Sequence, residues 1–114
     1  MMSLKNSQNQ ILLSELKVAS RFKDRAVGLL SYRNLEKNEG LWIHRCNSIH
    51  TFFMRFSIDC IFLTKEKKVC RVICRIAPWK LIWPIWNADS VIEVAAGVAE
   101  TWNLREGDVL YVSH

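Results

Sequence analysis

The sequence of 114 residues lacks several features that would place it in a class at once. No apolar run reaches the roughly 18 residues that a membrane-crossing helix needs, so no transmembrane helix is expected. Residues 1–10 are polar and hold no apolar stretch typical of a secretory signal. The 16 Lys and Arg residues outnumber the 11 Asp and Glu residues, but no basic block occurs, so the charge permits an anionic partner without requiring one. We expect a cytoplasmic protein, or a periplasmic one if an export segment has been removed.

Cysteine is also too scarce for a disulfide scaffold. Two of the four cysteines, Cys70 and Cys74, lie in an alternating segment at residues 69–76. Strand alternation places both on one face with Val72 and Ile76, and places Arg71 and Arg75 on the other. We therefore predict buried thiols that act as small hydrophobic side chains in a reducing compartment.

Several catalytic signatures are missing as well. The sequence has no glycine-rich phosphate loop, no Ser-centred nucleophile elbow and no dinucleotide fingerprint, which argues against a nucleotide-dependent enzyme. The spacing of His44, Cys46, His50 and Cys60 fits no zinc module, and nothing marks Cys46 or Cys60 as activated by His50. We expect no metal and no cofactor; a metal set and a Cys–His nucleophile pair remain minor alternatives.

Half of the residues are hydrophobic, which is enough for the core of a single globular domain. We expect residues 1–10 to be frayed and residues 11–114 to form that domain. Hydrophobic alternation predicts strands over 11–19, 41–45, 52–63, 69–76, 90–95 and 108–112, the last of them central. A helix is predicted from an N-cap at Ser20 and a short helical turn from Gly97, whereas residues 77–88 are expected to be irregular because they contain two prolines. The pattern is that of an α+β domain with a small, mostly antiparallel, curved or barrel-like sheet and one or two short helices.

Four short motifs, in this order and spacing, resemble the domain of unknown function 192 family (UPF0127) of small bacterial and archaeal proteins. They are Arg25-x-x-Gly28-Leu29, Leu35 followed by Gly40-Leu41-Trp42-Ile43, the stretch from Phe52 to Phe62, and Val91–Gly97 followed by Leu104-x-x-Gly107-Asp108. The resemblance implies an α+β fold of mainly antiparallel strands and implies no activity. Phe56-Ser57 stands where the family pattern has Asn-Thr, which puts in doubt a polar pocket built from that pair.

Three charged residues lie inside apolar stretches: Arg25, Asp59 and Glu93. A buried charge is expensive unless it is paired and hydrogen-bonded. Asp59 could pair with Arg25, or accept hydrogen bonds from turn amides, in a structural role. Alternatively, Asp59 could be the acceptor or general base of a polar site, with Glu93 sharing acid–base work.

Aromatic residues gather in the segment bounded by Pro78 and Pro84, where Trp79, Trp83 and Trp86 lie near Lys80. The tryptophans could close the core as a lid, or form a stiff contact surface for a protein, a sugar or single-stranded nucleic acid. A second cluster, Lys65, Lys67, Lys68, Arg71 and Arg75, is typical of a solvated sheet face, with an anion-binding patch as the alternative.

These patterns favour a non-enzymatic ligand- or partner-binding module over an enzyme. Its candidate site residues are Arg25, Asp59, Glu93, Trp79, Trp83 and Trp86, and the Trp79–Trp86 loop would select a protein or small-molecule partner. One alternative is a small hydrolase- or isomerase-like enzyme that uses Asp59 with Arg25 or His50. A further alternative is a basic nucleic-acid-binding module.

Overall fold

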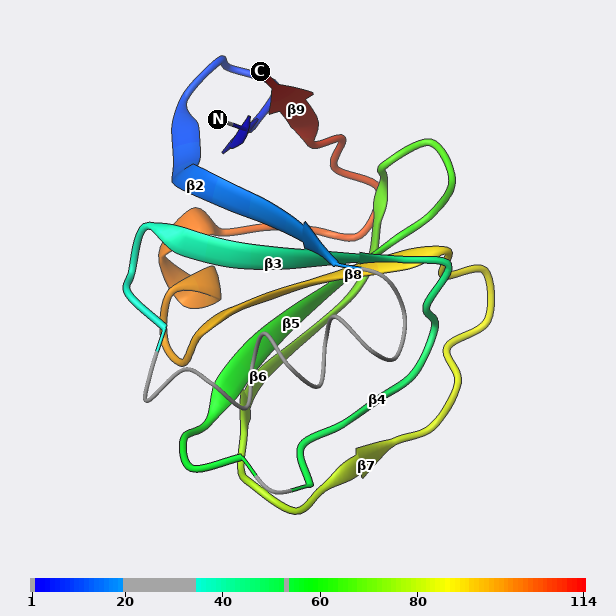
Figure 1. Ribbon diagram of the computed structural model, residues 1–114. Coiled ribbons are helices and arrows are strands. Elements are labelled where there is room, and N and C mark those ends of the chain that lie inside the picture. Colours follow the sequence, from blue (N-terminus) through cyan, green and yellow to red (C-terminus); the bar gives the residue numbers. More distant parts are fainter. Residues whose placement is uncertain (1, 20–34, 53) are drawn as a thin grey trace.

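A computed structural model describes residues 2–19, 35–52 and 54–114, and its main feature is one curled sheet of seven strands (Figure 1). The strands are β1 (Met2–Lys5), β2 (Ile11–Ala19), β3 (Glu39–His44), β5 (Ile58–Leu63), β6 (Val69–Ile76), β8 (Ser90–Ala95) and β9 (Tyr111–Ser113). Their order across the sheet is β6-β5-β8-β3-β2-β1-β9, and all neighbours are antiparallel except β2 and β3. The mostly antiparallel, curved sheet is confirmed. The described residues are mainly strand, with one short 3₁₀ helix, η1 (Ala99–Trp102), after the predicted turn at Gly97.

Two hydrophobic cores lie on opposite faces of this sheet. Every residue of β5 is buried, and its side chains alternate: Ile58, Cys60 and Phe62 join one core, while Ile61 and Leu63 join the other. The core that contains Ala99 of η1 and the preceding Val98 is called here the η1-side core. Because both faces of β5 are covered, its sequence is a nearly continuous apolar run.

The other core is covered by a small two-stranded sheet of β4 (Ile49–His50) and β7 (Leu81–Ile82), seen apart from the main sheet in Figure 1. We call residues 45–52, 54–57 and 77–88 the lobe, and the core beneath it the lobe-side core. Ile49, Met54 and Ile85 of the lobe are buried in that core. Most of residues 77–88 lies outside regular structure, as expected, but the pairing of β4 with β7 was not predicted.

The N-terminal residues are not frayed. Met2–Lys5 forms β1 between β2 and β9, and Leu4 is fully buried in the η1-side core. The polar composition of the segment concealed this strand, because its pairing depends mainly on backbone hydrogen bonds and a single buried leucine.

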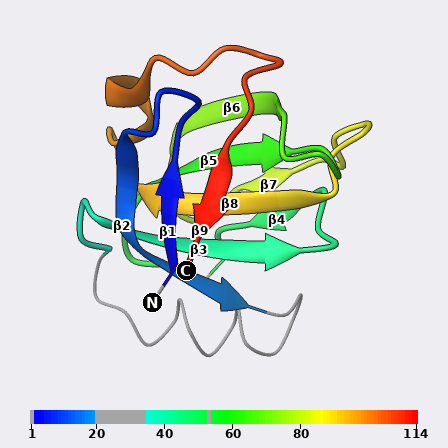
Figure 2. The same ribbon diagram turned by 90° about the horizontal axis from the view of Figure 1, so that it is seen from above.

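The prediction of a central last strand is also wrong. β9 begins only at Tyr111 and lies at the edge of the sheet, next to β1 (Figure 2). The preceding residues bond to the other edge instead: the Val69 amide donates to the Asp108 carbonyl at 2.8 Å, and the Leu110 amide donates to the Lys67 carbonyl at 3.0 Å. Residues 107–110 thus link the two edges of the curled sheet, and Leu110 in this link is buried in the η1-side core.

Cys74 is exposed, contrary to the expectation that it is buried beside Cys70. The register between β5 and β6 shifts in two places, between Ile58 and Cys60 and between Phe62 and Leu63. Each shift is a β-bulge, which breaks the alternation on which the prediction depended. The helix predicted from Ser20, with Arg25 and Gly28, lies outside the described residues.

Candidate functional site

Asp59 is fully buried on the face of β5 that points toward η1. Its Oδ1 accepts a hydrogen bond from the Arg75 amide at 2.7 Å, and its Oδ2 accepts from the amides of Gly97 at 2.9 Å and Ala99 at 3.0 Å. The carboxylate therefore joins the bulge in β6 to the turn that begins η1. Two structural roles were considered for Asp59, and the hydrogen bonds to backbone amides correspond to the second of them. The first, an ion pair with Arg25, involves a residue that lies outside the described residues.

The surface above Asp59 is closed by an ion pair. Arg75 Nε lies 2.9 Å from Glu100 Oε1, and the hydrogen bond and charge of Glu100 raise the pKa of Arg75. Gly97 has a φ of 92°, and a Cβ added there would lie 3.4 Å from the Arg75 guanidinium. The guanidinium thus packs over the backbone that binds Asp59, and glycine permits both the turn and this approach.

Glu93 lies on the opposite face of the sheet from Asp59. In the register, Glu93 pairs with Cys60 on one side and Leu41 on the other, and both belong to the lobe-side core. Directly paired residues share a face, whereas Asp59 pairs with Val94 of the η1-side core. The sheet therefore separates the two carboxylates, and they cannot share one acid–base step.

His50, the alternative partner for Asp59, belongs to the lobe. It is exposed on β4 and stacks on Phe52, while the neighbouring Ile49 packs into the lobe-side core. His50 and Asp59 are consequently on opposite sides of the main sheet.

The three tryptophans of the loop are exposed, by 59% at Trp79, 76% at Trp83 and 91% at Trp86. These values contradict the interpretation of the rings as a lid that completes the core. A packed Trp removes about 150–250 Å² from water, and these three rings leave most of that area in solvent.

Other apolar side chains extend this exposed area. The Phe52 ring stacks between His50 and Trp79, with centroid separations of 4.8 and 6.0 Å. Leu81, which is 53% exposed, pairs with His50 in the register, and Trp83 follows two residues later. We call His50, Phe52, Trp79, Leu81 and Trp83 the aromatic surface. Phe52 and Leu81 were missed as site residues, and His50 was considered only as a partner of Asp59, because no local signal reveals the pairing of β4 with β7.

A buried threonine fixes the backbone beneath this surface. Thr51 Oγ1 donates to the Ala77 carbonyl at 2.6 Å and accepts from the Lys80 amide at 2.8 Å. The Trp79 amide donates to the Thr51 carbonyl at 2.9 Å. Trp79 has a φ of 65° directly after Pro78, typical of a type II turn, where glycine is normally required at that place.

A polar recess of about 440 Å³ lies on another part of the molecule, between the β1–β2 turn and the residues after η1. It is lined in part by Asn6, Gln10, Trp102, Asn103 and Arg105. Nothing in the sequence patterns pointed to it, because its walls are turns that are distant in the chain.

Two further features are absent from the part of the chain that the structure describes. No group of three or more His, Cys, Asp or Glu side chains there could hold a metal ion. Among the same residues, no helix has the length and apolar character to span a membrane.

Comparison with known proteins gives relatives over nearly the whole chain. A UPF0127 protein of Thermococcus sibiricus is 33% identical over 113 residues, covering 94% of this chain and 71% of the relative. One from Pyrococcus horikoshii is 32% identical over 114 residues, covering 94% of this chain and 95% of the relative.

Two crystal structures share the fold. One is a protein from Sinorhizobium meliloti, described as a candidate transcription regulator, with a TM-score of 0.79 and 16% identity over 97% of this chain and 91% of that one. The other is a protein of unknown function from Novosphingobium aromaticivorans, with a TM-score of 0.78 and 17% identity over 96% and 82% of the two chains. The DUF192 family model, described as "Uncharacterized ACR", matches residues 3–112. The chain therefore belongs to the DUF192 (UPF0127) family, as its motifs indicated.

Proposed function

We propose that this protein is a non-enzymatic binding module and that the aromatic surface, with Trp86 nearby, is where its partner binds. The observation that carries the proposal is the exposure of Trp79, Trp83 and Trp86 on one loop. Contiguous exposed apolar area of this kind usually marks an interaction site, because it is unfavourable in water when nothing covers it.

The rigidity of the loop supports the same function. Thr51 bonds the turn at Ala77 and Lys80, while Pro78 and Pro84 restrict the backbone. A surface that is already ordered loses less conformational entropy when a partner binds. The left-handed conformation of Trp79 is unfavourable for a bulky residue, and such strain is concentrated at functional sites.

The contacts of Asp59 support a structural role over that of a general base. Three backbone amides occupy the carboxylate, and it is fully buried. A general base must lie within hydrogen-bond reach of the proton that it removes. In the proposed function, Asp59 maintains the fold and takes no part in binding.

The test compares folding with binding in the variants Trp83→Ala and Trp86→Ala, with Tyr111→Ala at an exposed aromatic residue of β9 as the control. The probes are oligothymidylate, chitooligosaccharide, a proline-rich peptide and phospholipid vesicles, followed by tryptophan fluorescence. We expect stability within about 0.5 kcal/mol of the parent for all three variants. Binding of at least one probe should weaken tenfold or more in Trp83→Ala and remain unchanged in Tyr111→Ala. Three outcomes overturn the proposal. They are a large loss of stability in Trp83→Ala or Trp86→Ala, binding of every probe unchanged in both variants, and no binding of any probe by the parent.

A further inference from the structure

We infer that the partner of the aromatic surface is single-stranded nucleic acid, held by base stacking on the rings and by phosphate contacts to the cations around them. This inference rests on the proposed function and names the chemistry of its ligand.

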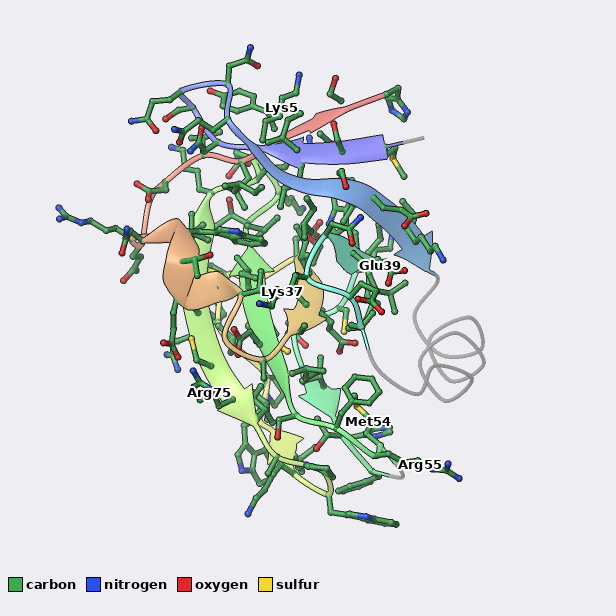
Figure 3. The ribbon with its side chains drawn as sticks, turned by 90° about the vertical axis from the view of Figure 1, so that its left-hand side faces the viewer. Lys5, Lys37, Glu39, Met54, Arg55 and Arg75 are labelled. Carbon is green, nitrogen blue, oxygen red and sulfur yellow. The ribbon has the colours of Figure 1, made fainter. Side chains whose placement is uncertain are left out.

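The first support is the charge of the lobe. Its residues include Arg45, Arg55 and Lys80 and contain no Asp or Glu, although the whole chain has 11 acidic residues. All three cations are exposed, and Lys80 lies between Trp79 and Leu81 of the aromatic surface. Figure 3 shows Arg55 extending into solvent at the end of the molecule far from Lys5.

The first carboxylate that follows the lobe in the sequence does not cancel the positive charge of the lobe. Asp89 lies where the lobe joins the main sheet, and its backbone bonds there to Leu63 and Cys46. Glu93 lies on the lobe side of the sheet but is fully buried, and Asp59 is buried on the opposite side. The lobe therefore presents positive charge to a polyanion.

The second support is the shape of the apolar area. It consists mainly of rings: His50, Phe52 and Trp79 form a stacked row, Trp83 is exposed on the same loop as Trp79, and Leu81 is the one aliphatic member. Bases stack on such rings, each contributing about 1–3 kcal/mol, whatever their sequence. Rings interleaved with cations are the usual composition of a single-strand surface, in which the backbone lies along positive charge.

Other ligands fit these residues less well. A membrane surface would also attract cations and tryptophans, but insertion is favoured by a broad aliphatic face, and the aromatic surface has only Leu81. A sugar would be oriented by polar groups beside the rings, and the lobe has no carboxylate for that purpose.

Salt dependence provides a quantitative expectation. For single strands, the slope of log K against log salt concentration is about −0.7 per phosphate neutralised. Contacts by Arg45, Arg55 and Lys80 would together give a slope of about −2. Each of Arg55→Ala and Lys80→Ala should reduce its magnitude by about 0.7.

The test uses the full chain and fluorescein-labelled oligothymidylate and oligouridylate of about 12 nucleotides, a length within known single-strand site sizes. Anisotropy is measured from about 20 to 200 mM NaCl for the parent and for Arg55→Ala, Lys80→Ala and Trp83→Ala. Lys65→Ala, an exposed cation of the β5–β6 hairpin, is the matched charge control, and Tyr111→Ala is the matched aromatic control.

We expect binding that weakens with salt, at least tenfold weaker binding in Trp83→Ala, and parent-like binding in both controls. Binding of either oligonucleotide supports the inference, and a preference for oligouridylate assigns a contact to the 2′-hydroxyl. The inference is overturned if neither oligonucleotide binds at low salt or if the affinity is independent of salt. It is also overturned if Lys65→Ala weakens oligonucleotide binding as much as Lys80→Ala does.

Vesicles of phosphatidylcholine and phosphatidylserine, chitooligosaccharide and a proline-rich peptide are measured in parallel. If one of these binds in a Trp83-dependent manner while the oligonucleotides do not, the inference fails and the proposed function stands. If Trp83→Ala alters binding of none of them, both fail.

Discussion

Thr51 and Lys80 bind each other through two hydrogen bonds of 2.8 Å. The Thr51 amide donates to the Lys80 carbonyl, and the Lys80 amide donates to Thr51 Oγ1. Thr51 is fully buried although it is polar, so the fold places a satisfied hydroxyl directly beneath the aromatic surface. The Thr51 side chain thus holds the turn that carries Trp79.

We predict that Thr51→Val destabilises the protein by about 1–3 kcal/mol, because the Lys80 amide and the Ala77 carbonyl each lose a partly buried hydrogen bond to the buried Thr51 hydroxyl. Urea denaturation measures the change. Thr64→Val is the control, since the Thr64 hydroxyl accepts from the Lys68 amide in an exposed turn and should matter less. Equal losses in the two variants would contradict the assigned role of Thr51.

We predict that Asp59→Asn destabilises the protein by about 3 kcal/mol or more. Both carboxylate oxygens of Asp59 accept from backbone amides, whereas an Asn side chain has only one accepting oxygen, and its NH2 group would face an N–H donor. Chemical denaturation measures the loss. The exposed Asp108, which accepts from the Arg105 amide at 2.8 Å, provides the control variant Asp108→Asn with a smaller effect. A stable Asp59→Asn protein that had lost a measurable activity would restore Asp59 as a catalytic candidate.

Comparing glycine with alanine at residue 79 should separate the effect of backbone strain on stability from the effect of the ring on binding. We predict that Trp79→Gly is more stable than Trp79→Ala by about 1 kcal/mol, because only glycine adopts a φ of 65° without a Cβ penalty. Both variants lose the ring, so both should bind oligonucleotide equally weakly. Thermal unfolding and anisotropy give the two quantities, and equal stability of the two variants would remove the argument from strain.

The Cys74 thiol should react slowly with alkylating reagents despite its exposure. Partial desolvation of the sulfur raises the pKa of the Cys74 thiol, and the negative charges of Asp59 and Glu100 raise it further. Because the thiolate is the nucleophile, we expect iodoacetamide to modify Cys74 more slowly than a free thiol at pH 8, with the rate increasing at higher pH. Site-resolved mass spectrometry follows the reaction.

The variant Glu100→Gln removes one of these charges and should accelerate the modification. The same pKa shift acts on folding: as the pH rises above the ordinary thiol value, the unfolded chain ionises first, so stability declines on the alkaline side. Cys74→Ser should reduce that decline. A rate in Glu100→Gln equal to that of the parent would contradict the electrostatic cause.

Much of the sheet could be predicted from local alternation. The strands over residues 11–19, 69–76 and 90–95 have the predicted bounds. Each has either an alternating pattern of apolar residues or a continuous apolar run, which is typical of a strand covered on both faces. The strand at β3 was predicted within two residues at its start. By contrast, β5 is only the second half of the apolar stretch from Phe52, since the first half belongs to the lobe.

The candidate site was less predictable. The buried acidic position at Asp59 was recognisable as a charge in an apolar run, but its partners are backbone amides, which leave no trace in the sequence. Trp79, Trp83 and Trp86 were recognised by type, whereas their exposure depends on how the lobe packs. Cys74 was misplaced because a bulge changes side-chain direction without any distinctive residue type.

The pairing of β1 with β9 has a consequence for the order in which the protein can fold. Ser3 lies opposite Ser113 and Lys5 opposite Tyr111, so this pairing joins the first strand of the sheet to the last one in chain order. Contacts between such distant residues form slowly, because a long loop must close first. During folding, one edge of β1 therefore stays unpaired until β9 arrives, and that contact completes the sheet.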